Sequence, residues 1–144
     1  MSVRRALEAD LPQLLALLAE LDDEPPLSMT EALPLWRALE SAGGSYYLLE
    51  HEGEAVGAFC LLVYPLLVHG GQRQAVVDAV VVRRALRGQG WGKRLMQAAM
   101  ALAAEAGAGK LALSSSQRRL DAHAFYRALG FAQHGISLVV EPIR

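Results

Sequence analysis

The chain of 144 residues is predicted to fold as an α/β protein with a mixed central sheet. Short apolar runs typical of strands are interspersed with longer segments in which leucine and alanine recur at helical spacing. One apolar run also leads through a basic, glycine-rich loop directly into a helical segment, a connection typical of α/β folds. This length buries a substantial core, so we expect a single domain over residues 1–144.

The first part of the chain is predicted to form a strand and two helices. Residues 2–5 are a short edge strand, and Asp10 is positioned to cap the helix that follows. That helix carries a leucine stripe, formed by Leu11, Leu14, Leu15, Leu18 and Leu21. An acidic loop with two prolines ends the helix, and a second helix is predicted over residues 30–39.

The remaining elements are predicted to alternate between strands and helices. Three strands are bounded by turns that contain glycine, and they span residues 46–51, 56–64 and 74–82. The last four elements are a helix, a strand, a helix and a closing strand, over residues 90–106, 110–113, 119–129 and 132–140. The predicted order is therefore βααβββαβαβ.

Composition argues against several classes of protein. The apolar fraction of 53% excludes a disordered chain, and a net charge of −1 gives no indication of a nucleic-acid partner. The N-terminus lacks a signal peptide's apolar core, and no run approaches the roughly 18 apolar residues of a membrane span. The single cysteine, Cys60, fits a reducing cytoplasm, and no Cys/His spacing indicates a metal site.

The most informative segment runs from Val80 to Met96. An apolar run enters a short basic loop, glycine then recurs at alternate positions, and a helical pattern begins. Glycine lets backbone N–H groups approach a ligand closely, and the start of a helix binds anions. Arg87 and Lys93 would be unfavourable beside the positive end of a helix unless a bound polyphosphate offset their charge.

Two familiar phosphate motifs do not fit this loop. A P-loop has four residues between its glycines and then Lys followed by Ser or Thr. Here only three residues lie between Gly88 and Gly92, and Lys93 is followed by Arg94. A dinucleotide fingerprint has the spacing G-x-G-x-x-G and an acidic residue after the next strand, whereas this loop has G-x-G-x-G and serines.

The remaining match, Arg87-x-x-Gly90-x-Gly92, resembles the acyl-CoA pyrophosphate loop of the GNAT (Gcn5-related N-acetyltransferase) superfamily. A second segment, residues 122–131, is similar to the family signature A-x-x-F-Y-x-x-x-G-F and follows at the family's spacing. Its Gly130 would stop a short helix, and Phe131 would pack back on the last turn. The resemblance implies a GNAT fold, with about six to seven strands, four flanking helices and a splayed pair of parallel central strands.

The same resemblance implies that acetyl-CoA is the co-substrate, and the lack of a Cys/His spacing predicts no metal. Strand backbone would pair with the pantetheine amides, and loop N–H groups would bind the pyrophosphate. The residues implied at the cofactor are Val80, Val81, Val82, Arg87, Gly88, Gln89, Gly90, Trp91, Gly92, Lys93, Ser115, Ala122, Phe125 and Tyr126.

For catalysis, the resemblance places Tyr126 at the sulfur, where its phenol would protonate the departing CoA thiolate. The general base has two candidates. Asp78 stands where related enzymes often carry Glu, and strand alternation puts it on one face with Val80 and Val82. His123 is the alternative because its ordinary pKa lies near neutrality.

The predicted reaction is direct acetyl transfer in a ternary complex to the primary amine of a small molecule or a peptide. A non-catalytic acyl-CoA sensor and a protein acetyltransferase remain alternatives. The acidic segment 21–36, with Trp36 at its end, would either attract a cationic acceptor or form a solvated loop. Trp91 has three open placements: against adenine, against a neighbouring helix, or against a partner subunit in a homodimer.

Overall fold

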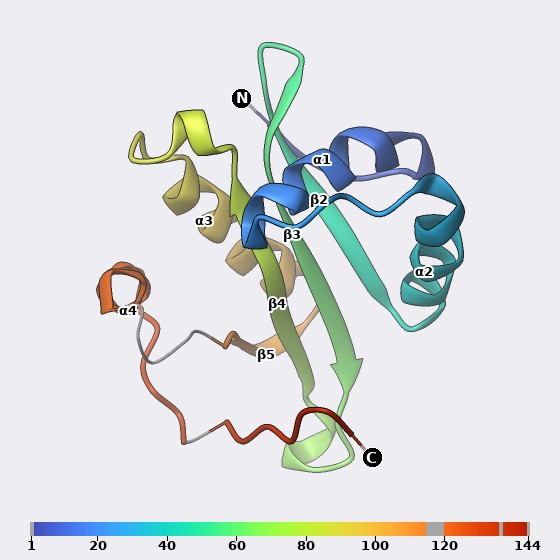
Figure 1. Cartoon of the computed structure of the whole chain (residues 1–144). Coiled ribbons are helices and arrows are strands. Elements are labelled where there is room, and N and C mark those ends of the chain that lie inside the picture. The colour runs from blue at the N-terminus through green and yellow to red at the C-terminus, as the bar shows by residue number, and fades with distance from the viewer. Residues whose placement is uncertain (1, 115–119, 136, 144) are drawn as a thin grey trace. The chain divides into compact units, whose positions relative to one another are not determined.

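The structure is a computed structural model that describes residues 2–114, 120–135 and 137–143. The chain forms two units, Met1–Ala112 and Leu113–Arg144. Figure 1 follows the chain from the blue N-terminus to the red C-terminus.

The first unit is built on a five-stranded sheet with the order β1-β2-β3-β4-β5. Its strands are β1 (Ser2–Arg5), β2 (Gly44–His51), β3 (Glu54–Pro65), β4 (Arg73–Val82) and β5 (Ala108–Ala112). Neighbouring strands are antiparallel from β1 to β4, whereas β4 and β5 are parallel. The mixed sheet that the sequence predicts is thereby confirmed.

Helices cover both faces of this sheet. They are α1 (Leu11–Asp22), α2 (Met29–Ser41) and α3 (Trp91–Glu105). Ala58 of β3 belongs to the core cluster that includes Leu11 and Leu14 of α1, while a Cβ on the adjacent Gly57 would meet Leu95 of α3. Successive strand residues point to opposite faces, so α1 and α3 lie on opposite sides of the sheet.

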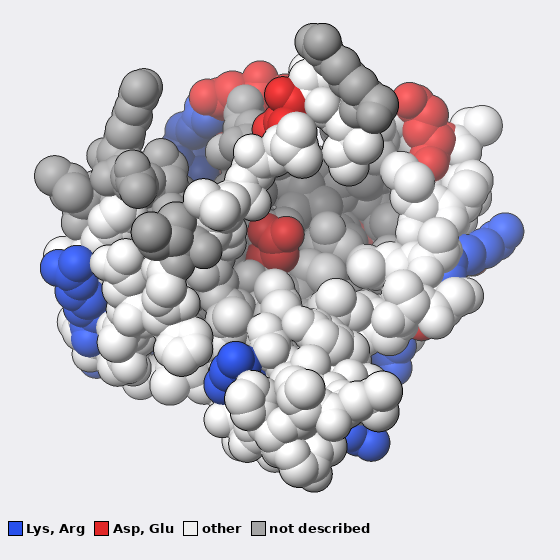
Figure 2. Space-filling model, turned by 90° about the horizontal axis from the view of Figure 1, so that it is seen from below, with Lys and Arg blue, Asp and Glu red and all other residues white. Residues whose placement is uncertain are grey.

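The surface carries charges of both signs. Figure 2 shows one face, on which Lys and Arg side chains and Asp and Glu side chains are dispersed among uncharged residues. Among the residues that the structure describes, no three His, Cys, Asp or Glu side chains are grouped to hold a metal ion. None of the helices in that part of the chain combines the length and hydropathy needed to cross a bilayer.

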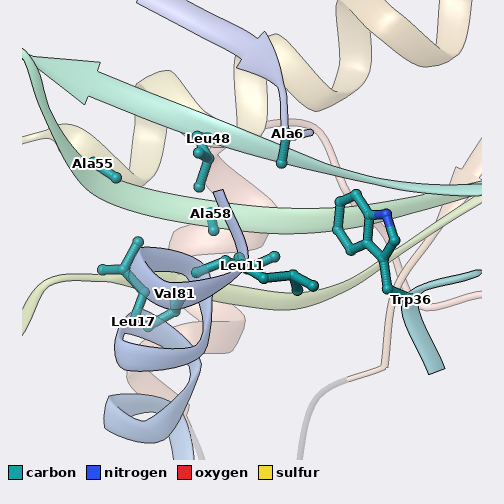
Figure 3. Packing of buried hydrophobic residues seen from close by; sticks show 9 residues of the cluster. Ala6, Leu11, Leu17, Trp36, Leu48, Ala55, Ala58 and Val81 are labelled. Carbon is teal, nitrogen blue, oxygen red and sulfur yellow. The ribbon is translucent and has the colours of Figure 1, made fainter. Parts of the chain in front are cut away.

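The core on the α1 and α2 side of the sheet is formed by small strand residues and the leucines of α1. Figure 3 shows Leu48, Ala58 and Val81, from three neighbouring strands, beside Leu11 and Leu17 of α1. The remaining members of the predicted leucine stripe pack partly buried against this cluster, at Leu15, Leu18 and Leu21. The leucine stripe therefore faces the core, as its helical spacing predicts.

The described part of the second unit contains α4 (Leu120–Ala128) and a C-terminal segment whose described residues form neither helix nor strand. The N–H of Gly130 donates to the Arg127 carbonyl at 3.0 Å, and the N–H of Phe131 donates to the Tyr126 carbonyl at 3.0 Å. This pair of bonds, with Gly130 at φ 100°, is a Schellman cap. The predicted helix stop is confirmed.

The number of strands differs from the prediction. The described residues form five strands rather than six to seven, and those of the range 132–140 do not form the predicted strand. A strand persists only where its backbone groups pair with a neighbour. Gly135, at φ 87°, interrupts the extended backbone within the predicted strand, so the apolar pattern alone was misleading.

Asp10 has a different role from the predicted one, because its side chain does not cap α1. Its carboxylate accepts hydrogen bonds from the Arg4 guanidinium at 2.8 Å, the Leu7 N–H at 2.7 Å and Gln13 Nε2 at 3.0 Å. These bonds, that of Arg4 above all, hold the pKa of Asp10 well below its usual range. The carboxylate thus fastens β1 to the start of α1.

Replacing Asp10 with Asn is expected to lower the free energy of unfolding by about 1–3 kcal/mol at pH 7, because bonds to a charged group are lost. The folded-state pKa is depressed, so this stabilisation is complete above the unfolded pKa of about 4 and is lost as the pH falls through the folded pKa. Urea unfolding at pH 7 and pH 3 should show a smaller difference between variant and wild type at pH 3. A constant difference would contradict this account; the exposed Glu8→Gln change serves as the control.

Candidate active site

The predicted phosphate loop joins β4 to α3. After Val82 the chain forms a short 3-10 helix, Arg84–Leu86, and enters α3 at Trp91. Gly88 and Gly90 have φ angles of 80° and 85°, in the left-handed region that glycine adopts readily. A Cβ at either position would meet no atom within 4 Å, so open space adjoins the backbone where a ligand would lie.

The start of α3 has the electrostatics of an anion site. No side chain caps it, its first turn holds no acidic residue, and Lys93 and Arg94 lie within that turn. The first N–H groups of a helix have no partner within the helix and carry its partial positive charge. An anion would therefore be stabilised here by both the backbone and the side chains.

Trp91 is buried, at 9% exposure, and packs against His51 at the end of β2. Its ring lies 4.8 Å from that of His51 between centroids, and the Arg94 guanidinium stands 5.3 Å from the indole centroid. None of the three placements considered from the sequence included this contact. Nothing near Trp91 in the sequence signals His51, which is 40 positions away, so sequence reasoning missed it.

A β-bulge interrupts β4 beside the loop. The register passes from Cys60 opposite Asp78 to Ala58 opposite Val81, so β4 contains one more residue than β3 across this interval. Ala79 has a φ of 51°, and its N–H donates to the Asp78 carboxylate at 2.8 Å. Bulges of this kind redirect a strand and are common beside active sites.

Because of the bulge, the side chains of β4 do not alternate between the two faces of the sheet as the sequence predicts. Asp78 lies opposite Cys60 and Val82 lies opposite Gly57, and these partners on β3 are three residues apart. Asp78 and Val82 therefore point to opposite faces of the sheet rather than sharing one. Since Cys60 and Ala58 share a face, Asp78 is directed to the side that α1 and α2 cover.

The two parallel strands pair only over a short stretch. Pairing runs from Arg73 opposite Ala108 to Val76 opposite Ala112, where β5 ends, while β4 continues to Val82. The described ladder therefore leaves the β4 edge over 77–82 without a β5 partner. Such an edge offers N–H and C=O groups to an extended ligand. Binding of pantetheine there stays a prediction.

Asp78 is the end of a row of three titratable side chains across the sheet. Tyr46 lies opposite Cys60, and Cys60 lies opposite Asp78. Burial, followed by the charges of Cys60 and Asp78, raises the pKa of Tyr46 to about 12. Burial, followed by Asp78, raises the pKa of Cys60 to about 11. The phenol and the thiol therefore hold their protons at neutral pH.

A cleft of about 170 Å³ lies between α1 and α2, on the same side of the sheet as Asp78. It is lined almost entirely by apolar side chains, namely Leu11, Leu14, Leu15, Leu18, Leu27, Ala32, Leu35, Trp36 and Leu39, together with Tyr46. Trp36, predicted as a wall of an acceptor pocket, stacks on Tyr46 at 6.3 Å between ring centroids.

The remaining predicted residues belong to the second unit or lie outside the described residues. Tyr126 on α4 meets Phe125 and Phe131 edge-on, with ring centroids 5.3 and 5.8 Å apart. Ala122 is buried and His123 is half-buried on the same helix. Ser115 lies outside the described residues. The first unit thus brings together Asp78, the β4 edge and the loop, while the second assembles the aromatic group around Tyr126.

Comparison with known proteins agrees with the motifs. A family model described as "Acetyltransferase (GNAT) family" matches residues 10–131. The chain is 33% identical over 129 residues to "Glucosamine 6-phosphate N-acetyltransferase" of Trypanosoma brucei brucei, covering 88% of this chain and 86% of that protein. It is 29% identical over 131 residues to "Probable glucosamine 6-phosphate N-acetyltransferase 2" of Oryza sativa subsp. japonica, covering 87% and 77%.

The fold of this chain is also similar to that of a solved structure, over almost the whole length of both chains. The crystal structure of a Trypanosoma brucei acetyltransferase superimposes with a TM-score of 0.85 at 31% identity. The match covers 97% of this chain and 98% of that one.

Proposed function

The chain belongs to the acetyltransferase (GNAT) family and is an acyl-CoA-dependent N-acetyltransferase, and on this premise we propose that it acetylates the primary amine of a small molecule with acetyl-CoA. One observation carries the choice of donor. An unpaired strand edge leads directly into a loop with two left-handed glycines and an uncapped, basic helix start. That arrangement suits a long ligand with amide groups at one part and a pyrophosphate at another.

In this proposal the donor lies along β4 and the loop. The backbone of Val80 to Val82 pairs with the pantetheine amides, and the N–H groups between Arg87 and Lys93 bind the pyrophosphate. The family match includes residues of both units, from 10 to 131, which supports our proposal that the chain works as one domain. The Ala122 and Phe125 positions of the family signature would contact the same cofactor.

The chemistry proposed is a direct attack of the amine on the thioester carbonyl. The new C–N bond forms, the C–S bond breaks, and the amine loses one proton while the CoA sulfur gains one. We assign the first proton to Asp78, directly or through a water, and the second to Tyr126. The backbone N–H near Val80, at the bulge, would stabilise the negative charge on the carbonyl oxygen.

The acceptor would enter on the side of the sheet that α1 and α2 cover, because Asp78 points to that side. Two relatives are named for glucosamine 6-phosphate, which makes this amino sugar the first acceptor to test. The acidic residue Glu24, which follows α1, is exposed and would favour the approach of a cationic amine.

Two measurements test the proposed function. Isothermal titration should detect acetyl-CoA binding at micromolar concentration, and no binding at high micromolar concentration would refute the assignment of the donor. Release of CoA thiol with a panel of amines, glucosamine 6-phosphate among them, then identifies the acceptor. If acetyl-CoA binds but no small amine is acetylated, the small-molecule acceptor is refuted and peptide amines are tested next.

Replacing Asp78 with Asn should lower kcat/KM by about 100-fold, because loss of a positioned base typically has this effect. The ascending limb of the pH profile should flatten, and activity should recover as the pH approaches the pKa of the amine itself. Glu52→Gln is a matched control, since the Glu52 side chain is 85% exposed in the β2–β3 turn. An unchanged profile would exclude Asp78 and favour His123 or bulk water as the base.

A further inference from the structure

The end of α1 is hydrogen-bonded to the loop that joins β4 to α3, which is the proposed binding loop for the acetyl donor. More than 60 residues separate the two segments in sequence. The Arg84 N–H donates to Glu20 Oε1 at 3.0 Å, and the Arg84 guanidinium pairs with Asp23. Arg87 Nη2 donates to the Glu20 carbonyl oxygen at 3.4 Å. Glu20 therefore accepts from the loop through both its side chain and its backbone.

These contacts differ in how strongly they hold the loop to α1. The Arg84 and Asp23 side chains are 56% and 77% exposed, and exposed ion pairs contribute little. The Glu20 hydrogen bond is also exposed, but the residue itself is half-buried, and its carboxylate accepts the backbone N–H of the first residue of the 3-10 helix Arg84–Leu86. A charged acceptor on a backbone N–H forms one of the stronger hydrogen bonds. Glu20 is therefore the principal link between α1 and the loop.

The two loop arginines are held in different ways. Arg84 has its charge balanced by Asp23, whereas Arg87 donates to two uncharged carbonyls, those of Val82 at 3.1 Å and of Glu20. A guanidinium carries five N–H donors, so these two bonds do not exhaust it. Arg87 is thus held between the ends of β4 and α1, and neither carbonyl neutralises its charge. Because its side chain is already held in place, Arg87 would lose less conformational freedom on binding an anion.

We propose that Glu20 is a positioning residue for the donor site: it holds residues 84–87 in the conformation that receives the pyrophosphate of acetyl-CoA. The inference rests on the proposed function, since it takes this loop as the donor site. Glu20 acts through Arg84 and Arg87 and has no contact with the reacting atoms. Its loss should therefore change donor affinity and leave the rate of transfer from the saturated enzyme nearly unchanged.

Three variants at this position separate geometry from charge. Glu20→Ala removes the acceptor and should raise the Kd and KM for acetyl-CoA about 5- to 20-fold, as expected for one lost charge-assisted hydrogen bond, with kcat within about 2-fold. Glu20→Gln keeps a carbonyl oxygen at the same reach and should restore affinity to within about 3-fold of wild type. Glu20→Asp keeps the charge on a shorter arm and should bind as weakly as the alanine variant. Asp23→Asn, in the exposed pair, is the control and should change the Kd less than about 2-fold.

Titration calorimetry measures the Kd for acetyl-CoA, and steady-state kinetics measures kcat and KM. Thermal unfolding checks that each variant folds. An unchanged Kd in Glu20→Asp or a folded Glu20→Ala variant, while the wild type binds acetyl-CoA, would overturn this inference alone. A fall in kcat that matches the rise in KM would assign Glu20 a general structural role and also overturn it. Absence of acetyl-CoA binding by the wild type would instead overturn the proposed function on which the inference depends.

Discussion

Replacing Tyr126 with Phe is expected to lower kcat about 100-fold, because the departing CoA thiolate then receives no proton from a positioned acid. The change removes only the hydroxyl group. The phenyl ring retains its edge-on contacts with Phe125 and Phe131, so α4 and its cap should be preserved. The Kd for acetyl-CoA should accordingly change much less than kcat, which marks an interaction made in the transition state.

Rapid-quench kinetics with saturating acetyl-CoA measures the chemical step apart from product release. Tyr64→Phe provides the matched control, since it removes a phenolic hydroxyl from β3 and should leave turnover unchanged. Unaltered turnover in the Tyr126→Phe variant would remove Tyr126 as the acid and leave protonation of the sulfur to solvent. An equal fall in affinity and turnover would instead indicate that the hydroxyl group binds the donor.

The Trp91→Ala variant is expected to lose about 3–5 kcal/mol of unfolding free energy, the range for truncating a large buried aromatic side chain. Trp91 is 9% exposed and begins α3, so its removal leaves a cavity between the start of the helix and His51 of β2. Because the indole braces the end of α3 that adjoins the loop, affinity for acetyl-CoA should fall together with stability.

Urea unfolding measures the first effect, and Trp91→Phe is the control because it keeps a ring against His51 and should lose considerably less. A double-mutant cycle with His51→Ala tests the contact itself. The two changes should be non-additive, since residues in contact share their interaction energy. A loss below about 1 kcal/mol for Trp91→Ala would mean that the surrounding structure closes over the cavity.

The helices and strands of the first unit could be predicted because their signals are local. The leucine stripe of α1 and the short apolar runs of β2 and β3, which are bounded by turns, depend on spacing within a few residues. The acyl-CoA loop and the Tyr126 segment are also short and contiguous, so they predicted the family that the match over residues 10–131 confirms.

The features that the sequence did not reveal depend on contacts between distant residues. Ala79 has no local reason to adopt a positive φ, and only pairing with β3 creates the bulge that turns Asp78 to the α1 and α2 side. The Trp91–His51 contact and the Glu20 link to the loop likewise join segments that are far apart in sequence. The strand predicted over 132–140, which the described residues of that range do not form, is the converse case, since an apolar pattern needs a pairing partner before it becomes a strand.

Cys60, which lies opposite Asp78 on β3, determines how the enzyme tolerates its own product, CoA. Every proposed turnover releases CoA as a free thiol, and mixed disulfides form through thiolates. Cys60 is buried and its pKa is raised to about 11, so few thiolates are present at neutral pH. The single cysteine of the chain should therefore resist S-thiolation by oxidised CoA, and activity should persist as coenzyme accumulates under oxidising conditions.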